Sequence, residues 1–390
     1  GIAAPSAAFS GDMTRTRSLL FALFLLAATF ALRGPFLQRA TWNLDEGITI
    51  TAAEQICAGG VLYRDAADHR NPLVPYLKAA LLAVCGDWNT VAVHAAIAVM
   101  VALIGVGLWR LARRLGHETV GRVAALVFVP LGFLLPSGDD ALAAHTEWFV
   151  LLFSTAAFLA FAAAIERPNV WRGLGVGSLF GLAFLCKQPG LPDLGVALVL
   201  LALLLSTERD RRGALSRLGF GCLTGFAAVV ALTIAYFAWH GATRDLLYYA
   251  WTYNSEVYVP SIPLPRRLLT LGEPFRLALH HLPSALGLGL LGAVVLLVAA
   301  WRGLRQQPVR IPLLPWLSLG WTASGIIAAS LGGRAFSHYS IQVLPGLSLA
   351  CGWVLVEGWR WCTVRGRSVR LAALAVLALA TADTGRRLVA

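Results

Sequence analysis

The chain has 390 residues, of which 58% are hydrophobic and only 13% are charged, and its formal net charge is +12. Soluble domains carry about 25% charged residues, so this composition excludes a soluble globular domain and indicates a polytopic membrane protein. The positive charge implies no nucleic-acid partner, because the basic residues concentrate in the short segments between apolar stretches, where they report membrane orientation.

Leu-, Ala- and Val-rich stretches long enough to cross a bilayer recur along the chain. A helix needs about 17 to 25 apolar residues to span the hydrocarbon core, whereas a β-barrel strand alternates apolar and polar residues. The sequence therefore predicts an all-α protein with about eleven transmembrane helices. The predicted spans cover 17–33, 88–109, 121–137, 146–164, 172–187, 190–206, 218–239, 284–301, 311–330, 340–357 and 369–383.

Two further apolar stretches, Gly47–Cys57 and Pro72–Cys85, are too short to cross and are interrupted by Gly, Pro or charge. We expect them to form helices lying along the membrane interface. Both fall in a first outer loop, 34–87, and a second long outer loop covers 240–283. The whole membrane domain covers 17–383, between a cytoplasmic N-terminal tail, 1–16, and a C-terminal tail, 384–390.

Orientation follows from the positive-inside rule. With a cytoplasmic N-terminus, every short cytoplasmic segment is positive and these segments hold more than half of the basic residues. Those residues are Arg15, Arg17, Arg110, Arg113, Arg114, Arg122, Arg167, Arg172, Arg209, Arg211, Arg212, Arg217, Arg302, Arg305, Arg310, Arg360, Arg365, Arg367 and Arg370.

On this topology, the polar residues that hydropathy does not explain face the outer compartment. They are Asp45, Glu46, Asp65, Asp68, His69 and Arg70 in the first outer loop, Asp139, Asp140, His145 and Glu147 in the next, Lys187 and Gln188 after the fifth span, Arg266 and Arg267 in the 240–283 loop, and Arg334 and His338 between the ninth and tenth spans. Chance would divide them between both faces, so the sequence predicts a site at the outer membrane surface.

Each of these residues also has a structural interpretation. The tandem Asp45-Glu46 would cap a helix and complement its dipole, and Lys187 would be an interface anchor. The pair Asp139-Asp140 follows a Pro-Ser-Gly sequence and favours a solvated turn. His69 and His338 are more typical of interfacial hydrogen-bonding groups than of metal ligands.

Taken together, carboxylates facing fixed cations at a lipid–water boundary suit a reaction in which a phosphate leaves and a hydroxyl attacks. Asp45 is the candidate general base. Lys187, Arg334 and either Arg266 or Arg267 are candidates for holding the phosphate and stabilising its developing charge. The donor would be lipid-linked, because the sequence has no Gly-rich phosphate loop and no soluble nucleotide-binding domain.

Six motifs cover nearly the whole chain. They are Leu44-Asp45-Glu46-Gly47, Gly60–Asp65 running into Asp68–Leu73, His145–Phe149, Gly181–Gln188, Tyr253–Val259 and Gly332–Tyr339. In this order they resemble the C-type (GT-C) membrane glycosyltransferases, in particular the bacterial relatives of protein O-mannosyltransferases and of the lipid A aminoarabinose transferase.

The resemblance implies a GT-C fold in a bacterial cytoplasmic (inner) membrane and an inverting transfer from a polyprenyl-phosphate sugar to a glycan, lipid or protein hydroxyl. It implies that Asp45 is the base, that Glu46 supports it or the acceptor, and that Lys187 contacts the donor phosphate. Through the motifs it implies further substrate contacts from Asp65, Asp68, His69, Arg70, His145, Glu147, Gln188, Tyr253, Asn254, Tyr258, His338 and Tyr339. Two departures are Arg70-Asn71-Pro72, where relatives often have Lys-Pro-Pro or His-Pro-Pro, and His145, where many have Asn.

Two alternatives stay open at this point. A flippase for the same lipid-linked sugar would bind the donor without transferring it, and a structural membrane subunit would need no catalytic base. A transporter is disfavoured, because the centres of the predicted spans are nearly free of charge and the sequence has no internal repeat. No cofactor is called for, but a divalent metal ion stays open if folding brings His69, His338 and Glu46 together.

Overall fold

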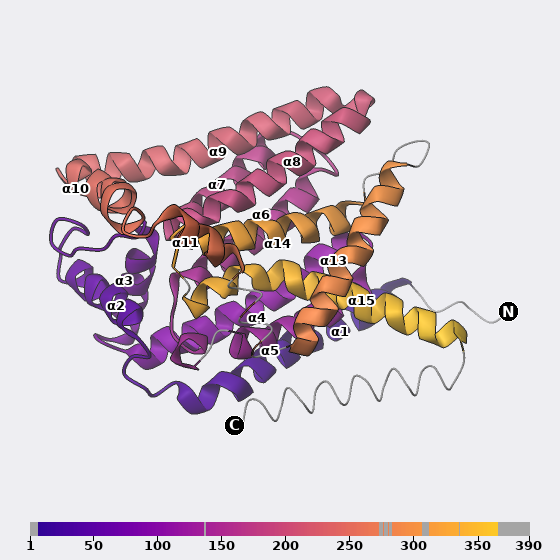
Figure 1. Ribbon diagram of the computed structural model, residues 1–390, viewed down its shortest axis with the longest axis horizontal. Helices are drawn as coiled ribbons and strands as arrows, with labels where there is room; N and C mark the ends of the chain where they lie inside the picture. The colour runs from indigo at the N-terminus through magenta and orange to yellow at the C-terminus, as the bar shows by residue number, and fades with distance from the viewer. Residues whose placement is uncertain are drawn as a thin grey trace.

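The computed structural model describes residues 7–135, 138–272, 276, 280, 283–305, 312–334 and 336–365. Within these ranges every regular element is a helix, and strand-like pairing is limited to one bridge between Leu62 and Ala66 (Figure 1). The prediction of an all-α membrane protein is thus confirmed.

Long helices form the body of the molecule. They are α1 (Ala7–Arg33), α4 (Thr90–Arg114), α5 (Glu118–Leu134), α6 (Thr146–Ala164), α7 (Val170–Cys186), α8 (Leu191–Thr207), α9 (Arg212–Trp239), α13 (Pro283–Leu304), α14 (Leu313–Ser330) and α15 (Leu344–Arg365). Each coincides with one of the first ten predicted spans, and the eleventh, 369–383, lies outside the described residues. In the described part of the chain, 7 helical segments are long and apolar enough to cross a membrane.

Two shorter helices, α2 (Leu44–Cys57) and α3 (Leu73–Cys85), connect α1 to α4 and pack against each other. They match the two predicted interface helices, except that α2 begins three residues before Gly47. Asn43 explains the earlier start, because its side chain accepts a 3.0 Å hydrogen bond from the Glu46 backbone N–H and so caps the helix. Asp45 and Glu46 therefore lie in the first turn of α2, where their charges complement the helix dipole.

Short helical segments join the long helices. They are η1 (Gly34–Phe36), η2 (Gly138–Ala141), η3 (Gln188–Gly190), η4 (Arg209–Arg211), α10 (Thr243–Leu247), η5 (Tyr248–Thr252), η6 (Asn254–Tyr258), α11 (Leu264–Leu269), η7 (Thr270–Gly272) and η8 (Ser337–Val343). The consecutive segments η5 and η6 are π-helical, a rare geometry that is frequent at functional sites.

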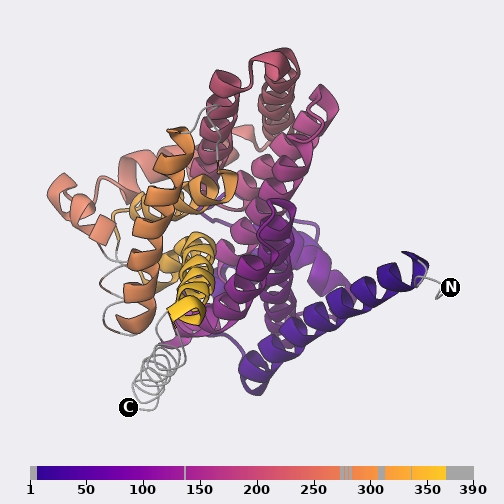
Figure 2. The same cartoon turned by 90° about the vertical axis from the view of Figure 1, so that its right-hand side faces the viewer.

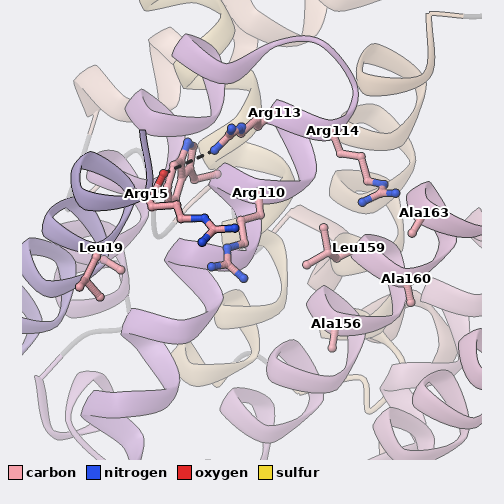
Figure 3. Close-up of a pocket in the computed structure, with 12 residues that line it drawn as sticks. Arg15, Leu19, Arg110, Arg113, Arg114, Ala156, Leu159, Ala160 and Ala163 are labelled. Atoms are coloured by element: carbon pink, nitrogen blue, oxygen red, sulfur yellow. Dashed lines mark hydrogen bonds between the residues drawn. The ribbon is translucent and has the colours of Figure 1, made fainter. Parts of the chain in front are cut away.

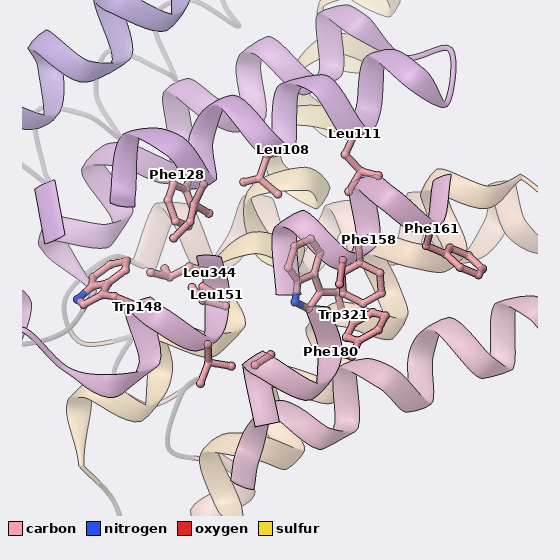
Figure 4. Close-up of a cluster of buried hydrophobic side chains, with 14 of the residues drawn as sticks. Leu108, Leu111, Phe128, Trp148, Leu151, Phe158, Phe161, Phe180, Trp321 and Leu344 are labelled. Carbon is pink, nitrogen blue, oxygen red and sulfur yellow. The ribbon is translucent and has the colours of Figure 1, made fainter. Parts of the chain in front are cut away.

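An aromatic core holds the middle of the bundle together (Figure 4). Trp148 and Phe158 on α6, Phe180 on α7 and Trp321 on α14 are fully buried. The Phe158 ring lies 5.2 Å from Phe180 and 4.5 Å from Trp321, so one α6 side chain joins three helices. This packing fixes α6, whose first turn carries polar residues of the predicted site.

Helices α7 and α9 approach each other closely because glycines line their contact. A Cβ on Gly173 or Gly177 of α7 would collide with the backbone of α9, and a Cβ on Gly221 or Gly225 of α9 would collide with the backbone of α7. Small residues at a spacing of four allow such contacts between membrane helices. The position of α7 is therefore fixed up to its C-terminal end, directly before Lys187.

Candidate functional site

A cavity of about 450 Å³ opens at the end of the bundle that carries α2, η2, η6 and η8. It is lined by Asn43, Leu44, Asp45, His69, Arg70, Asp140, Lys187, Tyr253, Tyr258, Arg334, Phe336, His338 and Tyr339. A narrower cavity of about 110 Å³ adjoins it and shares His69, Arg70, Lys187, Tyr258 and Tyr339. The two cavities bring together residues from six separate segments of the chain.

Asp45 presents its carboxylate to the wider cavity, with 38% of the side chain exposed. Its Oδ1 lies 2.6 Å from Nη2 of Arg70, and its Oδ2 lies 3.8 Å from Nε2 of His338. Burial disfavours the ionised form, but the charge and hydrogen bond of Arg70 outweigh burial and lower the pKa of Asp45 below its usual value. Asp45 is therefore a carboxylate at neutral pH.

Arg70 is held in place by a second carboxylate, that of Asp68. The Arg70 backbone N–H and Nη1 donate to Oδ1 of Asp68 at 3.0 and 3.1 Å, and both side chains are buried. Burial disfavours the guanidinium charge, but Asp68 and Asp45 outweigh it and raise the pKa of Arg70. The result is a fixed cation behind Asp45.

On the opposite wall of the cavity, Asp140 connects side chains from separate segments of the chain. Its Oδ1 accepts from Asn43 at 2.9 Å and lies 3.2 Å from Nε2 of His145, while its Oδ2 accepts from Ser337 at 2.5 Å and lies 3.2 Å from Nδ1 of His338. The two imidazoles stack with centroids 4.0 Å apart. Burial opposes ionisation, yet these hydrogen bonds hold the pKa of Asp140 far below its usual range. The interpretation of Asp140 as a solvated turn residue is wrong.

Lys187 extends from the end of α7 between the two cavities. Its Nζ lies 2.5 Å from Oε1 of the buried Glu147 and 4.3 Å from the centroid of the Tyr339 ring. Thr146 donates to the other Glu147 oxygen at 3.1 Å. An ammonium held by one buried carboxylate and an aromatic face still has N–H groups to offer a ligand.

Aromatic side chains cover the wall of the cavity between η6 and η8. His69 stacks on Tyr258 at 4.9 Å, and the Tyr258 hydroxyl lies 3.2 Å from that of Tyr339. Arg334 lies over the Tyr258 ring, with its guanidinium carbon 4.4 Å from the ring centroid. The Nε atom of Arg334 is buried and has no hydrogen-bond partner among the described residues. Burial and the charge of Arg70 lower the pKa of His69 to about 4, so this imidazole is neutral at pH 7.

Three other predicted contacts line or support these walls. Tyr253 lines the wider cavity, while Gln188 and Asn254 line the narrower one. Gln188 donates to the Ala250 carbonyl at 2.8 Å, and Asn254 donates to the His69 carbonyl at 2.6 Å. These bonds attach the π-helical segment to η3 and to the first outer loop.

Glu46 points away from both cavities. It is buried, and its Oε1 lies 2.5 Å from Nε2 of His94 on α4 while its Oε2 accepts from the Trp42 backbone N–H at 2.9 Å. Successive residues of a helix point about 100° apart, so Asp45 and Glu46 do not face the same space. The geometry assigns Glu46 to anchoring α2 on α4 and does not support its predicted role beside Asp45.

Two further predicted residues, Asp65 and Arg266, line neither cavity. Asp65 accepts from the Val61 backbone N–H at 2.7 Å and pairs with Arg64, which stabilises a turn. Arg266 is exposed on α11 and is absent from the lining of either cavity. The side chains of Arg267 and Asp139 lie outside the described residues. His69, His338 and Glu46, the residues for which a metal ion was left open, do not converge, because Glu46 faces His94.

Several residues that build the site carry no signal in the predicted motifs. Asn43 both caps α2 and bonds Asp140, and buried Arg33 donates to the Ala141 carbonyl at 2.7 Å, which fixes the segment that carries Asp140. The buried Lys78 donates to Thr49 at 2.6 Å and joins α3 to α2. Asn43 could have been predicted as a helix N-cap, because it stands just before the acidic pair. Arg33 could not, because an arginine at the end of a membrane span is typical of an interface anchor.

A different trio meets the geometric condition for a metal site. Asp45, His145 and His338 each offer a ligand atom within 4.8 Å of the others, and two imidazoles with a carboxylate form a donor set of the zinc type. However, Asp45 already pairs with Arg70, and Nε2 of His145 already contacts Asn43 at 3.0 Å. The fixed positive charge of Arg70 beside the would-be ligand disfavours a dication, so these residues fit the ion poorly.

Comparison with known proteins agrees with the fold. Residues 68–239 match the family model described as dolichyl-phosphate-mannose-protein mannosyltransferase. No curated protein sequence matches the chain. Among solved structures, it is similar to oligosaccharyltransferase AglB from Archaeoglobus fulgidus in complex with an inhibitory peptide and a dolichol-phosphate, with a TM-score of 0.62 and 14% identity over 95% of this chain and 55% of that one.

A second solved structure, the Archaeoglobus fulgidus oligosaccharyltransferase in complex with Zn and sulfate, gives a TM-score of 0.62 at 15% identity over 93% of this chain and 53% of that one. At this identity the likeness concerns the fold, and the chain spans about half the length of these structures. On these findings the chain is a polytopic membrane protein whose fold is similar to that of a GT-C oligosaccharyltransferase, and residues 68–239 match the model of the dolichyl-phosphate-mannose-protein mannosyltransferase family.

Proposed function

We propose that the chain transfers a sugar from a polyprenyl-phosphate donor to a hydroxyl of a glycan, lipid or protein at the extracytoplasmic face of a bacterial cytoplasmic membrane. The observation that carries this proposal is the Asp45 carboxylate, which faces a cavity that also receives the cations of Lys187 and Arg334. One group in this arrangement suits proton removal and two suit a departing phosphate.

The donor phosphate fits best where the two cavities meet, beside Lys187 and Tyr339. Arg334 reaches the same region and has a buried Nε without a partner among the described residues. The narrower cavity is also lined by the apolar residues Val259, Ala328 and Leu331, which suit the first units of a lipid chain. The geometry gives Arg266 no part in this step.

In the proposed reaction, the acceptor hydroxyl oxygen attacks the anomeric carbon while Asp45 takes its proton. The bond between that carbon and the phosphate oxygen breaks, and polyprenyl phosphate leaves with the electron pair. Lys187 and Arg334 stabilise the charge that develops on the phosphate. Attack from the face opposite the leaving group inverts the anomeric centre.

His338 and Asp140 position the reacting groups on the acceptor side. Asp140 fixes the ring of His338 through Nδ1, so Nε2 is directed toward Asp45. Arg70 fixes the other oxygen of Asp45. Held on both sides, the carboxylate has one preferred orientation, which favours an aligned attack.

The proposal is tested with purified full chain and a panel of labelled polyprenyl-phosphate sugars, with membrane extract as the acceptor. We expect one donor to yield labelled glycoside and free polyprenyl phosphate. Lipid binding without glycoside for every donor would contradict the proposal and favour a flippase for the lipid-linked sugar.

A further inference from the structure

A separate, arginine-lined cavity of about 1020 Å³ lies between α1, α4 and α6, and Figure 3 shows residues that line it. Helix α4 carries His94 near the candidate site and Arg110 in the arginine-lined cavity. At 1.5 Å per residue, the rise along α4 between these two residues is about 24 Å. The arginine-lined cavity and the candidate site therefore lie near opposite ends of α4.

Four arginines line this cavity, and two of them have no counter-ion among the residues that the structure describes. Arg113 lies 3.6 Å from Glu118, and Arg114 lies 2.9 Å from Glu166. Arg15 on α1 and Arg110 on α4 extend toward one another across the cavity in Figure 3, and among the described residues neither has a hydrogen-bond or ion-pair partner. Like charges that converge in this way repel each other unless an anion lies between them.

Below the arginines the cavity is apolar. Its lining is completed mainly by Leu19, Ala22, Trp109, Ala156, Leu159 and Ala160. Helix α1 forms one wall, and Figure 2 shows it leading away from the bundle toward its N-terminus. Only 17% of the apolar stretch of α1 is buried inside the protein, so the cavity opens toward the lipid.

We propose that this cavity binds an anionic glycerophospholipid of the adjacent leaflet. The lipid phosphate would lie between Arg15 and Arg110, and an acyl chain would lie along the apolar faces of α1 and α6. A topology signal alone requires basic residues in the loop, but it does not require two unpaired guanidinium groups to converge over an apolar floor. Basic clusters at a membrane surface attract anionic lipids, with a contribution from each arginine. This inference does not depend on the proposed glycosyl transfer.

The test measures lipid retention by native mass spectrometry on the full chain, purified in detergent and titrated with phosphatidylglycerol or phosphatidylcholine. We expect wild type to retain phosphatidylglycerol preferentially and Arg15→Gln/Arg110→Gln to bind it about tenfold more weakly or worse. The matched control is Arg209→Gln/Arg217→Gln, which removes the same charge from exposed arginines that do not line the cavity, and it should bind like wild type.

Equal binding of the two lipids by wild type, or equal loss in the control variant, would overturn the proposal. Displacement of the lipid by millimolar inorganic phosphate would also overturn it, because it would identify a site for a free anion. If the double variant is poorly folded, Arg15→Gln alone is compared, since Arg15 is exposed on α1. The single variant should then show the intermediate loss.

Discussion

The Asp45 carboxylate offers one oxygen to Arg70 and directs the other toward His338. A lowered pKa keeps it ionised but makes it a weak base in the free protein. This is compatible with catalysis, because the proton of the acceptor hydroxyl becomes acidic only as its oxygen bonds to the anomeric carbon. Arg70 thus lowers the basicity of Asp45, but it keeps the carboxylate ionised and holds it in one orientation.

The pH dependence of sugar transfer should depend on the ion pair between Asp45 and Arg70. Without Arg70, the pKa of Asp45 loses its strongest lowering influence, while burial, the largest cause, still raises it. Arg70→Gln should therefore move the acidic limb of the kcat/KM profile to higher pH by about one unit or more. Arg70→Lys is the control, because it keeps the charge and should leave the limb near that of wild type. An unmoved limb in Arg70→Gln would mean that Asp45 is not the titrating group.

Lys187 is predicted to act on the donor phosphate. Lys187→Met should raise the donor KM by about tenfold or more, since a charge-assisted contact contributes roughly 1.5–3 kcal/mol. Because this change also leaves the buried Glu147 without its cation, stability should fall by about 3 kcal/mol. Lys187→Met/Glu147→Gln is the matched variant, and it should recover stability in a thermal unfolding assay without recovering donor affinity. Recovery of both would refute the phosphate role.

Metal removal distinguishes a positioned base from a metal ligand. The ion pair between Asp45 and Arg70 occupies an oxygen that a metal ion at Asp45, His145 and His338 would need. We expect transfer to be unchanged after dialysis against EDTA. Loss of activity that added zinc restores would show instead that this trio is a metal site.

At the residue scale, the sequence was informative where chemistry is unusual and misleading where orientation decides. Lys187, His338 and Asp45 were readable because ionisable groups beside apolar spans are rare. Glu46 was paired with Asp45 because the two are adjacent, yet the helical rotation between them turns Glu46 to His94. Asp140 was read from its local Pro-Ser-Gly context, which carries no information about His338 or Ser337, nearly two hundred residues away in sequence.

Helix α2 carries Asp45, and its position depends on contacts made by its other face. Glu46 pairs with His94 on α4, and Thr49 accepts from Lys78 on α3. Burial opposes the charge of Glu46, but His94 lowers the pKa of that carboxyl. The pair therefore ties the first turn of α2 to a long membrane helix.

A double-mutant cycle measures this tie. Glu46→Gln and His94→Asn should each destabilise the protein by about 3 kcal/mol, as expected when one partner of a buried ion pair is removed, and the double variant should be no worse than either single variant. Thermal unfolding in detergent provides the measurement. Additive losses would mean that the two side chains act independently and that α2 is held in another way.

Element positions were well predicted from the sequence, and their boundaries less so. Ten described helices coincide with predicted spans because apolar length decides a membrane crossing. The π-helical turns η5 and η6 were not predicted, since their geometry depends on bonds such as that from Asn254 to the His69 carbonyl. Local sequence read this stretch only as a motif rich in aromatic and polar residues.

On the scale of the whole molecule, two different clusters of charged residues lie at opposite ends of the helix bundle. One end collects the carboxylates and cations around Asp45, and the other collects the arginines around Arg110. The arginine-rich end agrees with the positive-inside rule. The orientation itself stays a prediction that labelling can test.

Two native cysteines offer that labelling test. Cys57 ends α2 and Cys85 ends α3; both are free and exposed, whereas the other four cysteines are buried. A membrane-impermeant maleimide added to intact spheroplasts should label the chain, and Cys57→Ser/Cys85→Ser should not be labelled. As a control, Arg167→Cys in that background should react only after the membrane is opened. The reverse pattern would place the candidate site in the cytoplasm.

The most direct test of the central claim follows both products in one reaction, glycoside and free polyprenyl phosphate, with the active donor and with wild type and Asp45→Asn in parallel. The account predicts that the variant binds the donor with wild-type affinity but loses about 10²- to 10⁴-fold in turnover, the range expected for a general base. Turnover of Asp45→Asn at the wild-type rate would contradict the account, since the reaction would then proceed without the carboxylate around which the site is built.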